Sequence, residues 1–167
     1  MTRVGVISDT HGSFDKEFAA FFSGCDLLLH CGDWGDRSVL DKMRKIAPVK
    51  GVYGNIDGND IRIEFPEYLV FEVEKVRFLM IHIGGYPGRY SPLAKSLIRR
   101  HRPKIQISGH SHILKVINDP VYNLLHINPG AAGNSGFHKV KTALKFDIDG
   151  DNISNLKVLE VKRNRRI

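Results

Sequence analysis

The chain has little cysteine and no long hydrophobic run, and each shortage excludes a class of protein. Its 167 residues include only two cysteines, Cys25 and Cys31. Two thiols are too few for a disulfide framework. Because both lie in or beside apolar segments, we expect them to be buried and reduced. No stretch approaches the roughly 18 uninterrupted apolar residues of a transmembrane helix, and no signal-peptide pattern precedes the first apolar run. We therefore expect a cytoplasmic protein with no membrane partner.

Negative charge is also in short supply. The 18 acidic residues face 25 Lys and Arg, which gives a formal net charge of +7. This excess favours anionic partners through long-range attraction, without choosing among nucleic acid, nucleotide and membrane. Part of it lies in "RRHRPK" (99–104) and "KRNRRI" (162–167), which we interpret as a helix C-terminus and a solvated tail. Nuclease action aided by the basic tail stays open as an alternative.

What the sequence does contain is an ordinary globular composition. Hydrophobic residues make up 42% of the chain and charged residues 26%. The length suffices for one domain with a buried core. Because there is no internal repeat, low-complexity tract or linker, we predict a single domain over residues 1–167.

The first part of the chain alternates between two patterns. Short apolar runs at 4–8, 25–31 and 49–53 are typical of buried strands, whereas 14–22 and 36–47 have helical apolar spacing. Alternation of short strands with helices predicts parallel βαβ units.

The second part is richer in strands. "YLVFEVEKVRFLMIHI" (68–83) predicts a hairpin that turns at Glu74 and Lys75. Ser91 resembles a helix N-cap followed by Pro92 at the first helical position. The apolar stripe of this helix is assigned to Leu93, Leu97 and Ile98. Further strands are predicted at 104–108, 113–118, 122–128, 140–148 and 153–161, the last two joined by a hairpin at "DG" (149–150). The expected fold is an α/β sandwich of two sheets.

Polar residues follow the apolar runs at five separate points of the chain. They are Asp9, His11, Asp33, Asn55, His82, His110 and His112. Because ligand groups of open α/β sheets gather beyond the carboxyl ends of the strands, we expect all seven side chains at one edge.

Seven oxygen and nitrogen donors without a thiolate are too many for one tetrahedral zinc. They suit two metals about 3.5–4 Å apart, as in two-metal hydrolytic sites. One group must then bridge the metals, and Asp33 is the choice because Gly32 and Gly35 leave room around it. The mixture of carboxylate, imidazole and amide favours Mn, Fe, Zn or Ni over Mg or Ca.

These motifs resemble those of the calcineurin-like metallophosphoesterase superfamily. The family patterns D-x-H, G-D, G-N-x-D/E, an isolated His and G-H-x-H stand here in order. They are "DTH" (9–11), "GD" (32–33), "GNID" (54–57), His82 and "GHSH" (109–112).

The short length, "NPGA" (128–131) and the closing hairpin are most similar to the small bacterial and archaeal phosphodiesterase branch. The resemblance implies a four-layer α/β/β/α fold. It assigns one metal to Asp9, His11, Asp33 and His112. It assigns the other metal to Asp33, Asn55, His82 and His110. Manganese is the first expectation for both.

The resemblance also implies a metal-dependent phosphodiesterase, in which a hydroxide bridging the metals attacks the phosphate ester. Asn55, Asp57 and His82 would be catalytic, and the Asn55 amide could also donate to phosphate. Asp57 could equally serve as a turn residue. A phosphomonoesterase with the same site and a non-catalytic protein-binding scaffold, as in a retromer subunit of this fold, remain as alternatives.

The chain departs from the family pattern at two positions. Ile56 stands where many phosphatases of the superfamily have a His that protonates the leaving group. We therefore predict dependence on good leaving groups, and diester activity at least equal to monoester activity. Ile83 follows His82 where Gly is common, and its side chain should be tolerated there if it points into the core.

Two loops carry additional candidates. Loop 84–91 holds Tyr86 and Arg89, which we interpret either as a substrate lip or as surface residues of a turn. Loop 131–137 could close over the site or form a plain turn. The histidines without motif support are expected in packing or at the surface; they are His30, His101, His126 and His138. The substrate would be a phosphate-ester small molecule or nucleotide, and strand edges in the second half allow a homo-oligomer.

Overall fold

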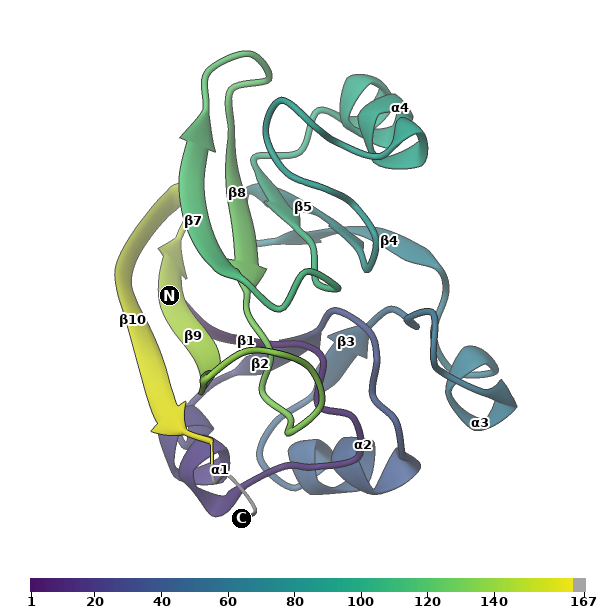
Figure 1. Cartoon of the computed structure of the whole chain (residues 1–167). Coiled ribbons are helices and arrows are strands. Elements are labelled where there is room, and N and C mark those ends of the chain that lie inside the picture. Colours follow the sequence, from purple (N-terminus) through teal and green to yellow (C-terminus); the bar gives the residue numbers. More distant parts are fainter. Residues whose placement is uncertain (164–167) are drawn as a thin grey trace.

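The computed structural model describes residues 1–163, and their strands form two mixed five-stranded sheets (Figure 1). The first sheet has the order β10–β9–β1–β2–β3. Within it β1, β2 and β3 run parallel, whereas β9 is antiparallel to both β1 and β10. The strands are β1 (Thr2–Ile7), β2 (Leu27–His30), β3 (Val49–Gly51), β9 (Val140–Asp149) and β10 (Asn152–Lys162).

The second sheet has the order β4–β5–β6–β8–β7. Its central strands β5, β6 and β8 are parallel, and antiparallel β4 and β7 close the two edges. The strands are β4 (Tyr68–Val73), β5 (Val76–Ile81), β6 (Ile105–Ile107), β7 (Leu114–Asp119) and β8 (Leu124–Pro129).

The main hydrophobic core lies between the two sheets. In β2, Leu27 and Leu29 point into it, while Leu28 belongs to a second core against the helices. Phe78 and Met80 of β5 reach the same inter-sheet core from the other side. Side chains of a strand alternate between its faces, so a strand covered on both faces must be apolar throughout. This explains the uninterrupted "LLL" of β2.

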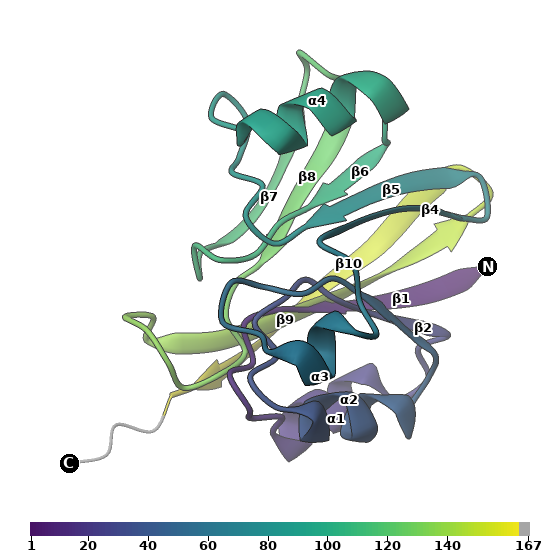
Figure 2. The ribbon, with the colours of Figure 1, turned by 90° about the vertical axis from the view of Figure 1, so that its right-hand side faces the viewer.

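Helices cover the outer faces of the sandwich (Figure 2). The first sheet is covered by α1 (Lys16–Phe22), α2 (Arg37–Arg44) and the short α3 (Asn59–Arg62), whose buried apolar residues share one core with β2. Helix α4 (Pro92–His101) packs on the second sheet. The expected two-sheet sandwich flanked by helices is confirmed, and the expected strands and longer helices all occur.

Helix α4 begins and ends as its sequence indicates. The Ser91 hydroxyl accepts from the Ala94 N–H, Pro92 occupies the first turn, and Arg102 ends the helix in the left-handed region. The predicted apolar stripe is wrong at one position: Leu93 is 38% exposed, and Ala94 is buried in its place. The buried face is centred between Ala94, Leu97 and Ile98, so Leu93 falls at its edge.

Helix α3 has only four residues and was not predicted, because so short a segment shows no helical period.

Positions 164–167 of the basic tail "KRNRRI" lie outside the described residues. Among residues 1–163, no helix is both long and apolar enough to span a membrane.

The different exposures of two leucines in α4 give a matched test of this packing. We expect Leu97→Ala to lower the free energy of unfolding by about 2–5 kcal/mol, since it removes buried methyl groups and leaves a cavity. Leu93→Ala should change it by less than about 0.5 kcal/mol. Urea denaturation followed by circular dichroism measures both, and equal losses would contradict the assignment of the buried face.

Candidate metal centre

The carboxyl ends of five strands bring the seven predicted ligands together. Residues from the loops after β1, β2 and β3 meet residues from the loops after β5 and β6, where the two sheets adjoin (Figure 1). The described part of the chain contains two clusters of His and Asp with converging ligand atoms. Each cluster draws on both sheets, so the sandwich must be assembled before either exists.

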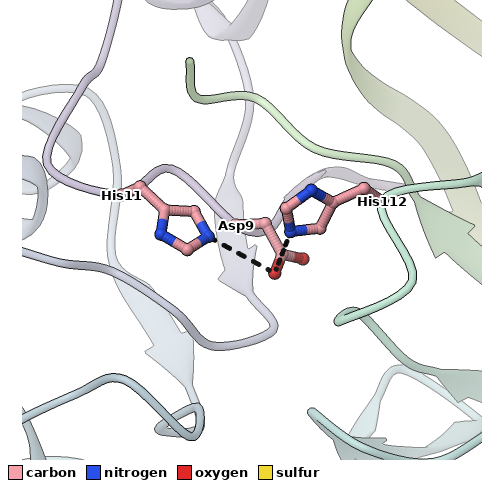
Figure 3. A group of neighbouring side chains, drawn as sticks. All are labelled: Asp9, His11 and His112. Carbon is pink, nitrogen blue, oxygen red and sulfur yellow. Dashed lines mark ion pairs between the residues drawn. The ribbon is translucent and has the colours of Figure 1, made fainter. Parts of the chain in front are cut away.

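The first cluster comprises Asp9, His11 and His112 (Figure 3). His112 Nε2 lies 3.2 Å from Asp9 Oδ1, and His11 Nε2 lies 4.0 Å from the same oxygen. Asp9 is fully buried, and the two histidines are partly buried. Three donor atoms from two loops thus surround one point.

The second cluster comprises Asp33, His82 and His110, joined by Asn55. His82 Nε2 lies 3.2 Å from Asp33 Oδ2. Asn55 Oδ1 lies 3.0 Å from both His82 Nε2 and His110 Nδ1. The structure therefore groups the residues as the resemblance assigns them, while their role as ligands stays a prediction.

Asp33 faces both clusters. Its Oδ2 is 3.7 Å from His11 Nε2 in the first cluster and 3.2 Å from His82 Nε2 in the second. A carboxylate in this position is suited to bridge two cations, as the sequence predicted for Asp33.

The glycine that leaves room beside Asp33 is neither of the two that were predicted. A Cβ on Gly54 would overlap the Asp33 carboxylate, so Gly54, not Gly35, opens the space beside Asp33. A Cβ on Gly32 would lie 2.6 Å from His82 Nδ1, and one on Gly35 would strike the backbone of His11. Each glycine lets a ligand-bearing loop approach a neighbouring loop closely.

Five of the seven residues have a left-handed backbone. Their φ angles lie between 47° and 68° and belong to Asp9, His11, Asp33, His110 and His112. Each such non-glycine residue costs on the order of 1 kcal/mol, and such conformations cluster at functional sites. Here they turn the chain sharply at the strand ends and aim successive side chains into one space.

The donor set fits divalent cations. Within residues 1–163, Asp9 Oδ1 and His11 Nε2 are buried and have no hydrogen-bond partner. Buried polar atoms in this state are costly, and a cation at the centre of the cluster would satisfy both. The other Asp9 oxygen accepts from the Ser8 hydroxyl at 2.7 Å and the His110 N–H at 3.1 Å, which keeps Oδ1 aimed at the cluster.

Backbone contacts also orient His82. Its Nδ1–H donates to the Cys31 carbonyl at 2.7 Å, so Nε2 presents a lone pair to Asp33 and Asn55 when the ring is neutral. Burial lowers the pKa of His82, but the Asp33 and Asp9 carboxylates outweigh it, and the pKa is raised overall. Burial raises the pKa of Asp33, yet His82 and the Ile56 N–H bring it below its ordinary value. A proton on His82 therefore competes with a cation, and acid should weaken metal binding.

Asp57 lies beside the centre and holds its loops. Its Oδ1 accepts from the Gly35 N–H at 3.0 Å, and its Oδ2 accepts from the Gly54 N–H at 2.8 Å. Both oxygens thus bind the loops that carry Asp33 and Asn55. These contacts favour the turn role for Asp57, and its catalytic role stays a prediction.

The predicted lip residues lie outside this network. Tyr86 packs under the Lys115 ammonium group, which lies 4.5 Å from its ring centre, and the Arg89 N–H donates to the Tyr86 carbonyl in a tight turn. Among the described residues, neither side chain hydrogen-bonds to the seven. Ile83 does not meet the condition of pointing into the core, since this residue is 48% exposed. The following residue, Gly84, packs tightly against Ser108, which directs the turn inward at Gly84 and leaves Ile83 in solvent.

Loop 131–137, for which the sequence left open a place over the site or a plain turn, packs beside the first cluster. The Gly133 N–H donates to the Asp9 carbonyl at 3.0 Å, and a Cβ on Gly136 would lie 2.5 Å from His112 Nδ1. His138 Nε2–H donates to the Gly133 carbonyl, and its ring lies edge-on to His112 with centroids 5.2 Å apart. The loop therefore packs against the first cluster. No motif marked it, because the contact depends on how the sheets are placed.

His30 and His126 match the expectation of packing roles. His30 is fully buried, stacks on Trp34 at 3.7 Å and lies 3.0 Å from the Thr10 hydroxyl. Burial lowers its pKa far below the ordinary value, so the ring is neutral. Buried His126 pairs with Gln106, and burial lowers its pKa to about 4.

Comparison with known proteins agrees with this geometry. The family described as "Calcineurin-like phosphoesterase superfamily domain" matches residues 2–151. A probable metallophosphoesterase of Methanocaldococcus jannaschii is 33% identical over 135 residues, which are 77% of this chain and 67% of the relative. A probable metallophosphoesterase of Methanothermobacter thermautotrophicus is 32% identical over 135 residues, which are 77% of this chain and 76% of the relative.

Solved structures share the fold. Vps29 from Entamoeba histolytica, in complex with zinc, has a TM-score of 0.75 and 19% identity, covering 97% of this chain and 99% of that one. A protein described as a novel archaeal phosphodiesterase has a TM-score of 0.72 and 22% identity, covering 94% and 99%.

Addition of Mn²⁺ to chelator-treated protein should raise its melting temperature. At a hundredfold excess over Kd, each occupied site adds about 2.7 kcal/mol to the free energy of unfolding. Asp33→Asn should lose most of this gain, because it removes the carboxylate that faces both clusters. The control Asp36→Asn makes the same chemical change at an exposed helix N-cap and should keep the gain. Identical melting curves with and without Mn²⁺, Ni²⁺, Zn²⁺ and Fe²⁺ would contradict the metal assignment.

Proposed function

Because the chain belongs to the calcineurin-like phosphoesterase superfamily, we propose that it is a phosphodiesterase that uses two divalent metal ions. The observation that carries the proposal is Asp33, whose Oδ2 faces His11 in one cluster and His82 in the other. The occurrence of the same fold in an archaeal phosphodiesterase supports it.

In the proposed reaction the metal ions and the protein side chains have different roles. Two bound cations would lower the pKa of a bound water molecule toward neutral pH. They would also neutralise the charge that develops on the phosphoryl oxygens. The chain supplies Asp9, His11 and His112 to hold one ion, and His82, His110 and Asn55 to hold the other, with Asp33 between them. Manganese is our first assignment for both ions, with nickel, iron and zinc as alternatives.

Asn55 has a second task in this proposal. Its Oδ1 faces His82 and His110, so its Nδ2–H group points elsewhere and is available to donate to a phosphoryl oxygen. Such a donor would orient the phosphate for in-line attack. Asn55 would thus bind both metal and substrate.

The absence of an acid at position 56 bears on the substrate. Ile56 cannot donate a proton, although its backbone N–H still holds Asp33 Oδ1 at 3.2 Å. A leaving group must then depart unprotonated, or with help from solvent. This favours esters of phenols and acidic alcohols over esters of ordinary alkyl alcohols. Tyr86 and Arg89 remain candidates for contacts with the leaving or retained ester group.

Two other functions stay in view. A phosphomonoesterase would use the same residues, and substrate preference alone separates it from a diesterase. A non-catalytic protein-binding scaffold could lose ligands without penalty, yet all seven residues are present. Nucleic-acid hydrolysis would use the same centre but rests on the basic tail alone, and self-association rests on strand edges alone, so both are weaker proposals.

The direct test is hydrolysis of bis(p-nitrophenyl) phosphate by chelator-treated protein with and without Mn²⁺. We expect turnover with Mn²⁺ only. Asn55→Ala should lower kcat/KM at least about a hundredfold, because a residue that binds metal and phosphate together acts on the transition state. Asn118→Ala, at an exposed position of β7, is the matched control and should retain the rate. Turnover with none of the four metals would favour the scaffold.

The lack of a proton donor at position 56 gives a second test. Ile56→His should raise kcat for diesters with poor leaving groups, such as phenol, by about tenfold or more, since general acids contribute about 10²–10⁴. Ile56→Gln, which is polar but has no titratable proton, should give no such gain. If wild-type rates do not depend on the pKa of the leaving group, the missing acid is not limiting and the interpretation fails.

A further inference from the structure

Both departures from the family pattern place an exposed isoleucine next to a candidate ligand. Ile56 follows Asn55 and Ile83 follows His82, and each is 48% exposed. A third isoleucine, Ile113, follows His112 and is 62% exposed. Consecutive Cα atoms are about 3.8 Å apart, so three loops bring three apolar side chains to the surroundings of one polar centre.

A fourth apolar side chain comes from another segment. Phe137 is fully exposed, and it follows Gly136, where an added Cβ would lie 2.5 Å from His112 Nδ1. We call Ile56, Ile83, Ile113 and Phe137 the apolar rim. The four residues come from four different loops, and each loop carries or contacts a residue of the candidate centre.

Single exposed apolar residues need no explanation, but a group around a functional centre does. The backbone fixes two of the four positions: the Ile56 N–H donates to Asp33, and Ile83 precedes the tightly packed Gly84. The hydrophobic cores of the sandwich contain none of the four. The rim is therefore not a misplaced part of the core.

We propose that the apolar rim binds an apolar ester group, aryl or alkyl, of the substrate diester. The inference rests on the proposed function, because a phosphate held at the centre leaves its ester groups to project toward the surrounding loops. The side chains of isoleucine and phenylalanine cannot hydrogen-bond to a sugar hydroxyl or a base edge. The rim therefore favours ester groups with a large apolar surface. The preferred substrate is thus amphiphilic, with a phosphate at the metals and a hydrocarbon at the rim.

A series of diesters with one common leaving group tests the proposal. Methyl, hexyl, phenyl and thymidine 5′-esters of p-nitrophenyl phosphate differ only in the retained group, so leaving-group effects cancel. With Mn²⁺ we expect kcat/KM for the hexyl or phenyl ester to exceed that of the methyl ester by about tenfold or more. The hexyl and phenyl arms distinguish alkyl from aryl recognition.

Variants locate the effect on the protein. Ile83→Ser combined with Ile113→Ser should bring the hexyl-to-methyl ratio of kcat/KM close to one. Ile117→Ser, at a 46% exposed position of β7, is the control and should keep the wild-type ratio. All positions are at the surface, and melting curves verify that each variant is folded.

The outcomes separate the two proposals. Equal kcat/KM across the series, preference for the thymidine ester over the phenyl ester, or an unchanged ratio in the double variant would overturn the apolar rim and leave the phosphodiesterase standing. Turnover of no diester with any metal would overturn the proposed function itself.

Discussion

The position of the Asp33 carboxylate between the two clusters is the constraint on which the centre depends. Its Oδ2 lies within 4 Å of a histidine from each cluster, and its Oδ1 is held by the Ile56 N–H. The carboxylate can reach this place because Gly54 has no side chain to collide with it. Asp57 fixes Gly54 in turn, by accepting from its backbone N–H. Asp33, Gly54 and Asp57 therefore form one packed unit beside the two clusters.

The backbone at the strand ends reflects the same demand. A strand that ended in an ordinary turn would send its polar residues along the surface. Here five of the seven residues take left-handed φ angles, which bend the chain back so that the side chains converge. The left-handed backbone costs free energy in the loops, and the packing of the two sheets behind them offsets it, because the inter-sheet core fixes the strand ends relative to one another. Backbone strain thus lies in the loops, and the stabilising packing lies in the sheets.

The surroundings of the centre carry the features particular to this chain. Tight loops and the Cys31 carbonyl fix the polar atoms, whereas the residues directly beyond them are apolar and exposed. If the centre holds phosphate as proposed, a border of apolar side chains is complementary to a substrate with a charged middle and an apolar end. Substrate choice in this chain would then lie in the loops, and the ligands would supply the chemistry common to the family.

The sequence by itself determined the order of strands and helices, the two-sheet sandwich and the seven polar residues, because hydrophobic period and residue spacing are local properties. The resemblance divided those seven between two metals, and the two observed clusters separate Asp9, His11 and His112 from Asp33, His82 and His110 along the same line. Only the tertiary structure decided which glycine clears space for Asp33, which way Ile83 points, and that loop 131–137 packs on His112. The structure also places Ala94, and not Leu93, on the buried face of α4. Such contacts join residues far apart in the chain, and their distances are set by how two sheets pack, which no local pattern encodes.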